Sequence, residues 1–260
     1  MSNELNRFSL EDDCHPHLLQ LLRIASPIAV LTGAGVSAES GILTFRDAMT
    51  GLWANFDPAD LATPEAFAKD PATVSRWYDE RRCKIAKCQP NAGHFALAKL
   101  QAVTIADRRS FALITQNVDR LHQAAGSKDV VELHGTLWLW RCLDCGIEYE
   151  ERGAAFSSYP LRCACGGSKR PGVVWFGEDL PKHALLTARR AAGSSALFVS
   201  IGTSGAVHPA AGLIDVAIQS GARFLEINPQ ETPYTSKAHW SLRGKSGEIL
   251  PQLLELAGAE

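Results

Sequence analysis

The chain has 260 residues, of which 46% are hydrophobic and 21% charged, and its formal net charge at pH 7 is -2. This balance is typical of folded globular proteins and excludes a disordered, collagen-like or coiled-coil chain. The nearly balanced charge argues against direct binding of nucleic acids. No apolar run approaches the roughly 18 residues that span a bilayer, and the N-terminus lacks a secretory pattern. We therefore expect a cytoplasmic protein that does not contact membranes.

Apolar and helix-like segments alternate along the chain. The leucine-rich segment 18–24 has one apolar face and predicts a first helix. Continuous apolar runs predict buried strands at 27–31, 111–115, 130–133, 196–201 and 223–227, and helices are expected at 92–101, 118–125, 180–192, 209–220 and 249–257. Strands that alternate with helices indicate an α/β fold, with a Rossmann-like parallel sheet covered on both faces.

Two segments interrupt this alternation. Residues 49–93 are rich in Trp, Pro and Ala and read as short helices and loops, and residues 139–171 contain four clustered cysteines. We expect these two insertions to form a smaller module, a helical insertion plus a zinc ribbon. The Rossmann-like domain would then comprise residues 18–48, 94–138 and 172–260.

The segment Gly33-Ala34-Gly35-Val36-Ser37-Ala38 follows the first predicted strand and fits the dinucleotide-binding pattern G-x-G-x-x-G/A. Such a loop brings the backbone close to a pyrophosphate and presents N–H groups to the anion. The pattern alone is weak, because a glycine turn between a strand and a helix needs no ligand. A hydride-transfer dehydrogenase is a poor fit, since the chain continues into the Trp-rich insertion where a second strand ending in an acidic residue is expected.

Four of the seven cysteines lie within 24 residues, in the order C-x-x-C, seventeen residues, C-x-C. They are Cys142, Cys145, Cys163 and Cys165. Four thiolates fill a tetrahedral site and leave no position for water, so we expect one structural zinc ion. The alternative is that these are ordinary thiols, and the odd cysteine count disfavours a disulfide framework in either case. No role is predicted for Cys14, Cys83 or Cys88.

Six motifs together are far more specific than the glycines. They are GAGVSAESGILTFRD (33–47), TQNVD (115–119), LHG (133–135), VWFGE (174–178), GTS (202–204) and INP (227–229). In this order, over residues 25–255, the chain resembles the sirtuins, which are NAD-dependent protein-lysine deacylases. The resemblance implies transfer of an acyl group from lysine to ADP-ribose, release of nicotinamide, NAD as co-substrate and a zinc ribbon.

The resemblance also implies roles for individual residues. His134 would be the general base, which suits a side chain that titrates near neutral pH, Asn117 would position ribose or water, and Asp119 would line the nicotinamide pocket. The implied NAD contacts are Gly33, Ala34, Gly35, Ser37, Phe45, Arg46, Gln116, Asn117, Asp119, Gly202, Thr203, Ser204, Asn228 and Ser246. The acyl-lysine peptide would lie along Val174, Phe176, Gly177 and Glu178. His94 is interpreted as a packing residue.

Tyr78 and Arg81 are three residues apart, so a helix would place them on one face. A hydroxyl and a guanidinium that converge in this way can bind a carboxylate at the end of an acyl chain. Spacing alone favours the alternative, a solvated helix face with an incidental Tyr–Arg pair. The Y-x-x-R motif, with DLATP (60–64) and PNAGH (90–94), resembles class III sirtuins, which remove succinyl and other acidic acyl groups.

Two other functions remain open at this point. The same NAD site could serve protein mono-ADP-ribosylation, in which His134 would matter less. Alternatively, the chain could be a catalytically silent NAD sensor or a zinc-dependent interaction module. The presence of Asn117, Asp119 and His134 argues against a silent protein.

Overall fold

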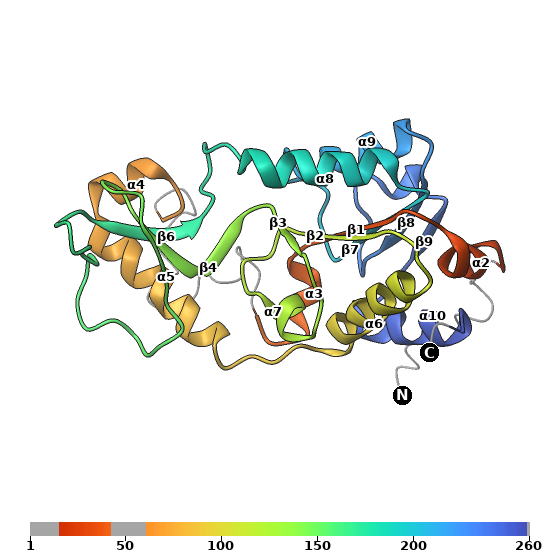
Figure 1. Cartoon of the computed structure of the whole chain (residues 1–260), viewed down its shortest axis with the longest axis horizontal. Helices are drawn as coiled ribbons and strands as arrows, with labels where there is room; N and C mark the ends of the chain where they lie inside the picture. Colours follow the sequence, from red (N-terminus) through yellow and green to blue (C-terminus); the bar gives the residue numbers. More distant parts are fainter. Residues whose placement is uncertain (1–15, 43–60, 259–260) are drawn as a thin grey trace, which may run out of the picture.

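The computed structural model describes residues 16–42 and 61–258. A six-stranded sheet has the order β3-β2-β1-β7-β8-β9, and all of its paired strands are parallel (Figure 1). Its strands are β1 (Ile28–Thr32), β2 (Phe111–Thr115), β3 (Val131–Glu132), β7 (Leu197–Ile201), β8 (Arg223–Ile227) and β9 (Trp240–Leu242). The five predicted strands are confirmed, and β9 is an additional one. Successive strands run outward from β1 in one direction and from β7 in the other, and the crevice at such a reversal is where open α/β sheets bind ligands.

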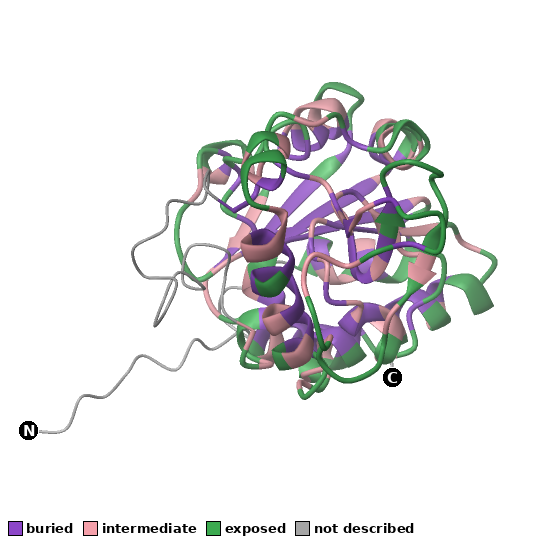
Figure 2. Ribbon diagram, turned by 90° about the vertical axis from the view of Figure 1, so that its left-hand side faces the viewer, coloured by how far each residue is buried: buried purple, intermediate pink, exposed green. Residues whose placement is uncertain are grey.

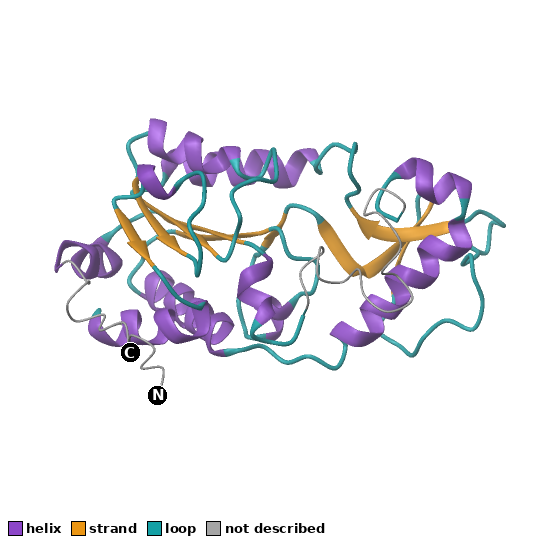
Figure 3. Ribbon diagram, turned by 180° about the vertical axis from the view of Figure 1, so that it is seen from behind, coloured by secondary structure: helices purple, strands orange, loops and turns teal. Residues whose placement is uncertain are grey.

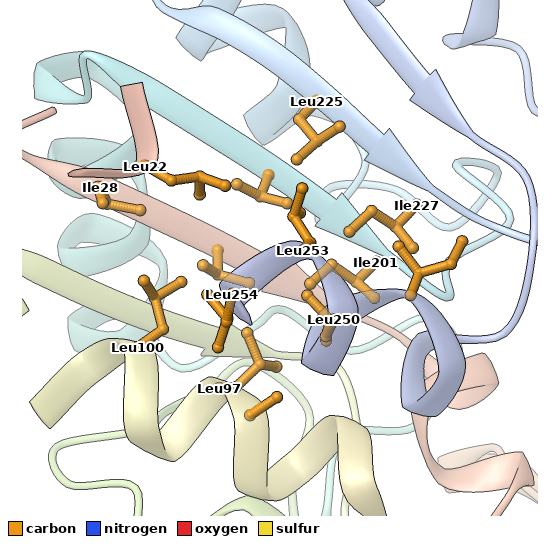
Figure 4. Packing of buried hydrophobic residues seen from close by; sticks show 14 of the residues in the cluster. Leu22, Ile28, Leu97, Leu100, Ile201, Leu225, Ile227, Leu250, Leu253 and Leu254 are labelled. Atoms are coloured by element: carbon orange, nitrogen blue, oxygen red, sulfur yellow. The ribbon is translucent and has the colours of Figure 1, made fainter. Parts of the chain in front are cut away.

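Successive residues of each central strand face opposite layers. On β1, Ile28 and Val30 belong to one hydrophobic cluster, whereas Ala29 and Leu31 belong to the other. The first cluster is covered by α2 (Pro16–Ile24), α6 (Ala92–Ala106) and α10 (Ser246–Leu256), and Figure 4 shows their leucines meeting the strands. The second cluster is covered by α8 (Lys182–Ser194) and α9 (Gly212–Gln219). The strands are thus buried on both sides (Figure 2), as continuous apolar runs predict.

A second sheet lies at the other end of the long axis of the molecule (Figure 3). It is antiparallel, with the order β5-β4-β6, and consists of β4 (Gly135–Cys142), β5 (Glu148–Glu150) and β6 (Lys169–Val173). It shares a hydrophobic cluster with α4 (Pro64–Lys69) and α5 (Pro71–Ile85), so the two predicted insertions pack together. Strand β4 already begins at Gly135, inside the range predicted for the larger domain. The division into two domains at the predicted bounds stays a prediction.

Two short helices follow the strands that carry the motifs. They are α3 (Ala34–Ala38), after β1, and α7 (Leu121–Ala124), after β2. Helix α7 is shorter than the predicted 118–125 because Arg120, at φ 61°, adopts the left-handed conformation just before it. A 3-10 turn at Thr235–Lys237 precedes β9. Across the described ranges no helix has both the length and the apolar character that crossing a membrane requires.

Candidate active site

The glycine loop after β1 packs directly on the loop after β7. The Gly35 N–H donates to the carbonyl oxygen of Gly202 at 2.8 Å, and Gly33 N–H donates to that of Ile201 at 3.0 Å. Gly202 has φ +59°, and a Cβ on it would lie 2.6 Å from the backbone nitrogen of Val36. Glycine is therefore required here by conformation and by close approach of two backbones.

A cavity of about 260 Å³ lies at the carboxyl ends of these strands. It is lined by Gly35, Ala38, Glu39, Gly202, Ile227, Pro229, Gly244, Lys245 and Ser246. Three of the predicted NAD-binding residues, Gly35, Gly202 and Ser246, are thus brought together. Asn228 is not part of this lining, and its side-chain amide donates to the carbonyl oxygen of Gln230 at 2.7 Å.

A buried network connects the glycine loop to the end of β2. The Asn117 amide donates to the Gly33 carbonyl oxygen and to Ser37 Oγ, both at 3.0 Å. The Ser37 hydroxyl donates to Asp119 Oδ2 at 2.8 Å, and the Leu121 N–H donates to Asp119 Oδ1 at 2.8 Å. Burial raises the pKa of Asp119, and these two donors oppose that rise. The structure therefore assembles Ser37, Asn117 and Asp119 into one unit.

Gln116 connects β2 to the loop after β7. Its side-chain amide donates to Thr203 Oγ1 at 3.0 Å, so these two predicted NAD-binding residues are adjacent. Ser204, next to Thr203, is exposed at the carboxyl edge of the sheet. The backbone carbonyl of Gln116 has a second partner, His134.

His134 follows β3, with its Nδ1 3.0 Å from the Gln116 carbonyl oxygen. Because a carbonyl oxygen only accepts, Nδ1 carries the proton, and Nε2 of the neutral ring has a lone pair to receive another. Burial lowers the pKa of His134, and the bond to Gln116 partly opposes this. The ring thus has the tautomer and the protonation state of a general base at neutral pH.

Two further histidines lie behind this network. His94 is buried, as expected for packing, and its Nε2 is also 3.5 Å from Ser37 Oγ. The ring of His122 lies 4.8 Å from that of His94, and its Nε2 is 3.0 Å from Thr32 Oγ1. His122 was not predicted from the sequence, although it lies only three residues after Asp119 and so close to the motif that ends β2.

The four clustered cysteines converge as predicted. Their sulfur atoms all lie within 4.8 Å of one another, with Cys142 and Cys165 at 3.5 Å and Cys145 and Cys163 at 3.7 Å. Zn–S bonds of about 2.3 Å in a tetrahedron place sulfurs about 3.8 Å apart, so the set fits one structural zinc ion. Sequence reasoning missed Tyr149, whose hydroxyl lies 2.9 Å from the Cys163 sulfur.

Tyr78 and Arg81 both lie on α5, where Tyr78 is buried and Arg81 is half-buried. Tyr78 is 4% exposed, and the Arg81 guanidinium carbon lies 4.7 Å from the ring centre of Trp77. Burial lowers the pKa of Arg81, and Tyr78 opposes this; burial raises the pKa of Tyr78, and Arg81 opposes that. The interpretation of this pair as a solvated helix face therefore does not hold for Tyr78, and Arg81 is only partly exposed.

The predicted peptide-binding segment runs between the two sheets. The Val174 N–H donates to the His134 carbonyl oxygen, and the Phe176 N–H donates to that of Ala62, both at 2.9 Å. The Phe176 side chain is 55% exposed, whereas the Glu178 carboxylate accepts hydrogen bonds from the Arg170 guanidinium and the Trp175 N–H. Gly177, between them, has φ +84°. The Glu178 side chain thus closes an internal turn, and the backbone N–H groups of Val174 and Phe176 have partners inside the protein.

Some predicted residues lie outside the described part of the chain. Phe45 and Arg46, predicted to contact NAD, belong to the undescribed range 43–60. Ile42, the last described residue before that range, packs against the cluster that includes Tyr78.

Comparison with known proteins identifies similar chains over nearly the whole length. A family model described as the Sir2 family matches residues 33–209. The "NAD-dependent protein deacylase 1" of Pseudomonas aeruginosa is 49% identical, over 92% of this chain and 98% of that protein, and the "NAD-dependent protein deacylase" of Aquifex aeolicus is 49% identical, over 88% and 94%. The structure of a Sir2 homologue in complex with NAD has a TM-score of 0.87 and 45% identity, and covers 94% of both chains. A Sir2 structure with a deacetylated p53 peptide and an acetyl ADP-ribose has a TM-score of 0.81 and 32% identity, over 92% of this chain and 96% of the other.

Proposed function

Because this chain belongs to the Sir2 family and is an NAD-dependent protein deacylase, we propose that it acts on lysine acyl groups that end in a carboxylate. The observation that carries the proposal is the adjacency on α5 of Tyr78, which is buried, and Arg81, which is half-buried, with each residue affecting the pKa of the other. A guanidinium partly withdrawn from water is stabilised by an anion, and a neighbouring hydroxyl can donate to the second oxygen of a carboxylate. An acetyl group offers neither interaction.

Tyr78 and Arg81, which we call the acyl-reading pair, are connected to the catalytic end of the sheet. Val118, between Asn117 and Asp119, packs against the cluster that contains Tyr78. The Trp175 ring lies 6.3 Å from that of Tyr78, and the preceding residue, Val174, is hydrogen-bonded to His134. An acyl-lysine laid along this segment would therefore have His134 near its amide and Tyr78 farther along the acyl chain.

The residues around the carboxyl edge of the sheet fit NAD. The cavity between Gly35, Gly202 and Ser246 would hold the adenosine end, and the backbones of the two packed loops would face the phosphates. Gln116 and Asn117 would face the nicotinamide ribose, and Asp119 would line the nicotinamide pocket. When bound, NAD supplies nicotinamide as a leaving group and ADP-ribose as acceptor of the acyl group.

This chain's own residues orient the reactants and move a proton. The Gln116 carbonyl holds His134 in the Nδ1-protonated form, so Nε2 can take a proton from a ribose hydroxyl. Gly33 and Ser37 hold the Asn117 amide in one orientation, which leaves its carbonyl oxygen to position ribose or water. The four cysteines would hold a zinc ion that stabilises the three-stranded sheet and takes no part in the chemistry.

Substrates would be acyl-lysine proteins or peptides, with no direct role for nucleic acid. Backbone pairing along residues 174–178 tolerates many peptide sequences, so the acyl group would be read more strictly than its surroundings. We place the protein in the cytoplasm, since clustered metal-binding thiols suit a reducing compartment.

The decisive experiment is mass spectrometry of the products formed from NAD and matched acetyl- and succinyl-lysine peptides. We expect succinyl-lysine to be used at least as well as acetyl-lysine, with release of nicotinamide and of acyl-ADP-ribose. Arg81→Met should lower kcat/KM for succinyl-lysine by about 10- to 100-fold and keep most activity on acetyl-lysine. Lys84→Met, which removes an exposed positive charge from the same helix, is the matched control.

Each other outcome has a distinct meaning. Equal loss of both activities in Arg81→Met would refute the carboxylate role. ADP-ribose left covalently on protein would indicate mono-ADP-ribosylation, and the absence of acyl-peptide-dependent nicotinamide release would indicate a silent NAD-binding protein.

A further inference from the structure

Two oppositely charged residues lie next to the acyl-reading pair and are completely buried. The side chains of Asp79 and Arg82 are 0% exposed, and their charged ends approach to 2.7 Å. Each follows one member of the acyl-reading pair by a single residue, so the two pairs point about 100° apart around α5. The charged pair therefore faces a different part of the molecule from Tyr78 and Arg81.

Arg82 binds the backbone of a long loop in the zinc ribbon, residues 151–159, between β5 and Cys163. Its guanidinium donates to the carbonyl oxygens of Glu151 at 3.1 Å, Gly153 at 2.8 Å and Ala154 at 2.8 Å. Three carbonyl groups on one short stretch of backbone are thus directed at a single side chain of α5.

Asp79 binds the following part of the same loop. Its Oδ2 accepts a hydrogen bond from the Phe156 N–H at 2.9 Å and another from the Tyr159 hydroxyl at 2.6 Å. The Phe156 ring also lies 4.8 Å from the guanidinium carbon of Arg82. The pair and loop 151–159 therefore form one closed polar network, which we call the α5 clamp.

A buried ion pair often contributes little to stability beyond what apolar residues of similar size would provide, because both charges lose their hydration. A fully hydrogen-bonded network does fix a single arrangement of the elements that it joins. The α5 clamp joins α5 to a loop that continues to Cys163, and the other end of that loop leaves β5 next to Tyr149. The orientation of α5 is thus tied to the four-cysteine site.

We infer that Asp79 and Arg82 are positioning residues for acyl selectivity, an inference that rests on the proposed function of Tyr78 and Arg81. Two-point recognition of a carboxylate requires both donors to be held within a fraction of an ångström. A loosened α5 raises the entropic cost of ordering these donors around the anion, and this cost appears in KM. An acetyl group does not use the donors, so its turnover is not sensitive to the clamp.

The test compares kcat and KM on matched succinyl- and acetyl-lysine peptides for the full-length, zinc-loaded protein. Tyr159→Phe removes one hydroxyl from the clamp. Arg82→Lys keeps the positive charge but removes the guanidinium N–H groups that bind the three loop carbonyls. Tyr234→Phe is the control, because it deletes a similar hydroxyl–carboxylate bond, of 2.7 Å to Asp215, beside the larger sheet. Arg81→Met reports on the proposed function itself.

We expect Tyr159→Phe and Arg82→Lys to raise KM for the succinyl peptide about tenfold, with kcat and both acetyl constants changed less than about twofold. Tyr234→Phe should leave the ratio of the two activities unchanged. The inference is overturned if the clamp variants lower the succinyl and acetyl activities equally, or if they lower neither activity, while Arg81→Met still loses only the succinyl activity. In that case the proposed function stands. If Arg81→Met is itself unselective, both proposals fail. Should Arg82→Lys not fold, as judged by circular dichroism, Tyr159→Phe decides alone.

Discussion

The Nδ1 atom of His134 lies 3.0 Å from the backbone carbonyl oxygen of Gln116, whose side chain donates to Thr203. One residue at the end of β2 therefore orients the base and also contacts the loop after β7. Orientation by a backbone carbonyl differs from orientation by a carboxylate, because the carbonyl adds no negative charge to raise the basicity of the ring.

The first prediction follows from this arrangement. Catalysis needs the neutral ring, and burial lowers the pKa of His134, so kcat/KM should rise with pH through a value below about 6.5 and be level above it. His134→Gln should lower kcat about 10²- to 10⁴-fold and preserve NAD binding. Steady-state kinetics between pH 4.5 and 8 provide the measurement, and an inflection well above 6.5 would contradict it.

The second prediction concerns acid stability. Burial lowers the pKa of His94 to about 4 and, together with the charge of His94, that of His122 to about 3. The unfolded chain binds these protons near pH 6.5, so the free energy of unfolding should fall as the pH decreases from about 6.5 to about 4. For His94 alone the loss is roughly 3 kcal/mol. Urea unfolding across this range measures it, and His94→Gln should flatten the dependence; an unchanged slope in that variant would exclude His94 as the cause.

The third prediction concerns the zinc site. The Tyr149 hydroxyl lies 2.9 Å from the Cys163 sulfur, and Lys169 Nζ lies 3.6 Å from the centre of its ring. A donor of this kind offsets the excess negative charge of four thiolates, so Tyr149→Phe should weaken zinc retention about 10- to 100-fold. Zinc release to a chromogenic chelator is the readout. Cys163→Ser should bind no stoichiometric zinc, and release from Tyr149→Phe at the wild-type rate would refute the role of the hydroxyl.

The fourth prediction separates backbone strain from ion pairing at Arg120. This residue has φ 61°, and its guanidinium pairs with Glu132 and Glu150 at 3.0 and 3.1 Å. Arg120→Gly and Arg120→Ala both remove these partly exposed pairs, but only glycine accepts the left-handed backbone at little cost. The alanine variant should therefore be about 1 kcal/mol less stable than the glycine variant in urea unfolding. Equal stabilities would show that the backbone there relaxes.

Most of the larger sheet was predictable because its strands are buried on both faces. Strands such as β1 and β7 are then mostly apolar, and they appear as nearly continuous apolar runs in the sequence. Strand β9 has only three residues, two of them half-buried, so it carries no such signal. The start of β4 at Gly135 was equally hidden, because only Leu133 and His134 separate it from β3.

The candidate site was predictable where a motif states both residue type and order, as for His134 and the four cysteines. The position of a functional-looking side chain was not predictable when its polar atoms bind another part of the same protein. Glu178 was predicted to lie along the peptide, but its carboxylate is held by Arg170. Asp79 and Arg82 lie in a charged run that normally indicates a solvated helix face, and only the course of a loop seventy residues away explains their burial.

The contact between Gly35 and Gly202 also bears on how this chain can change over generations. Any side chain at either position would displace the opposite loop, so neither site can mutate unless the other loop has already shifted. We therefore expect the two glycines to be retained together. Accepted substitutions should be concentrated elsewhere, on the outward faces of the covering helices.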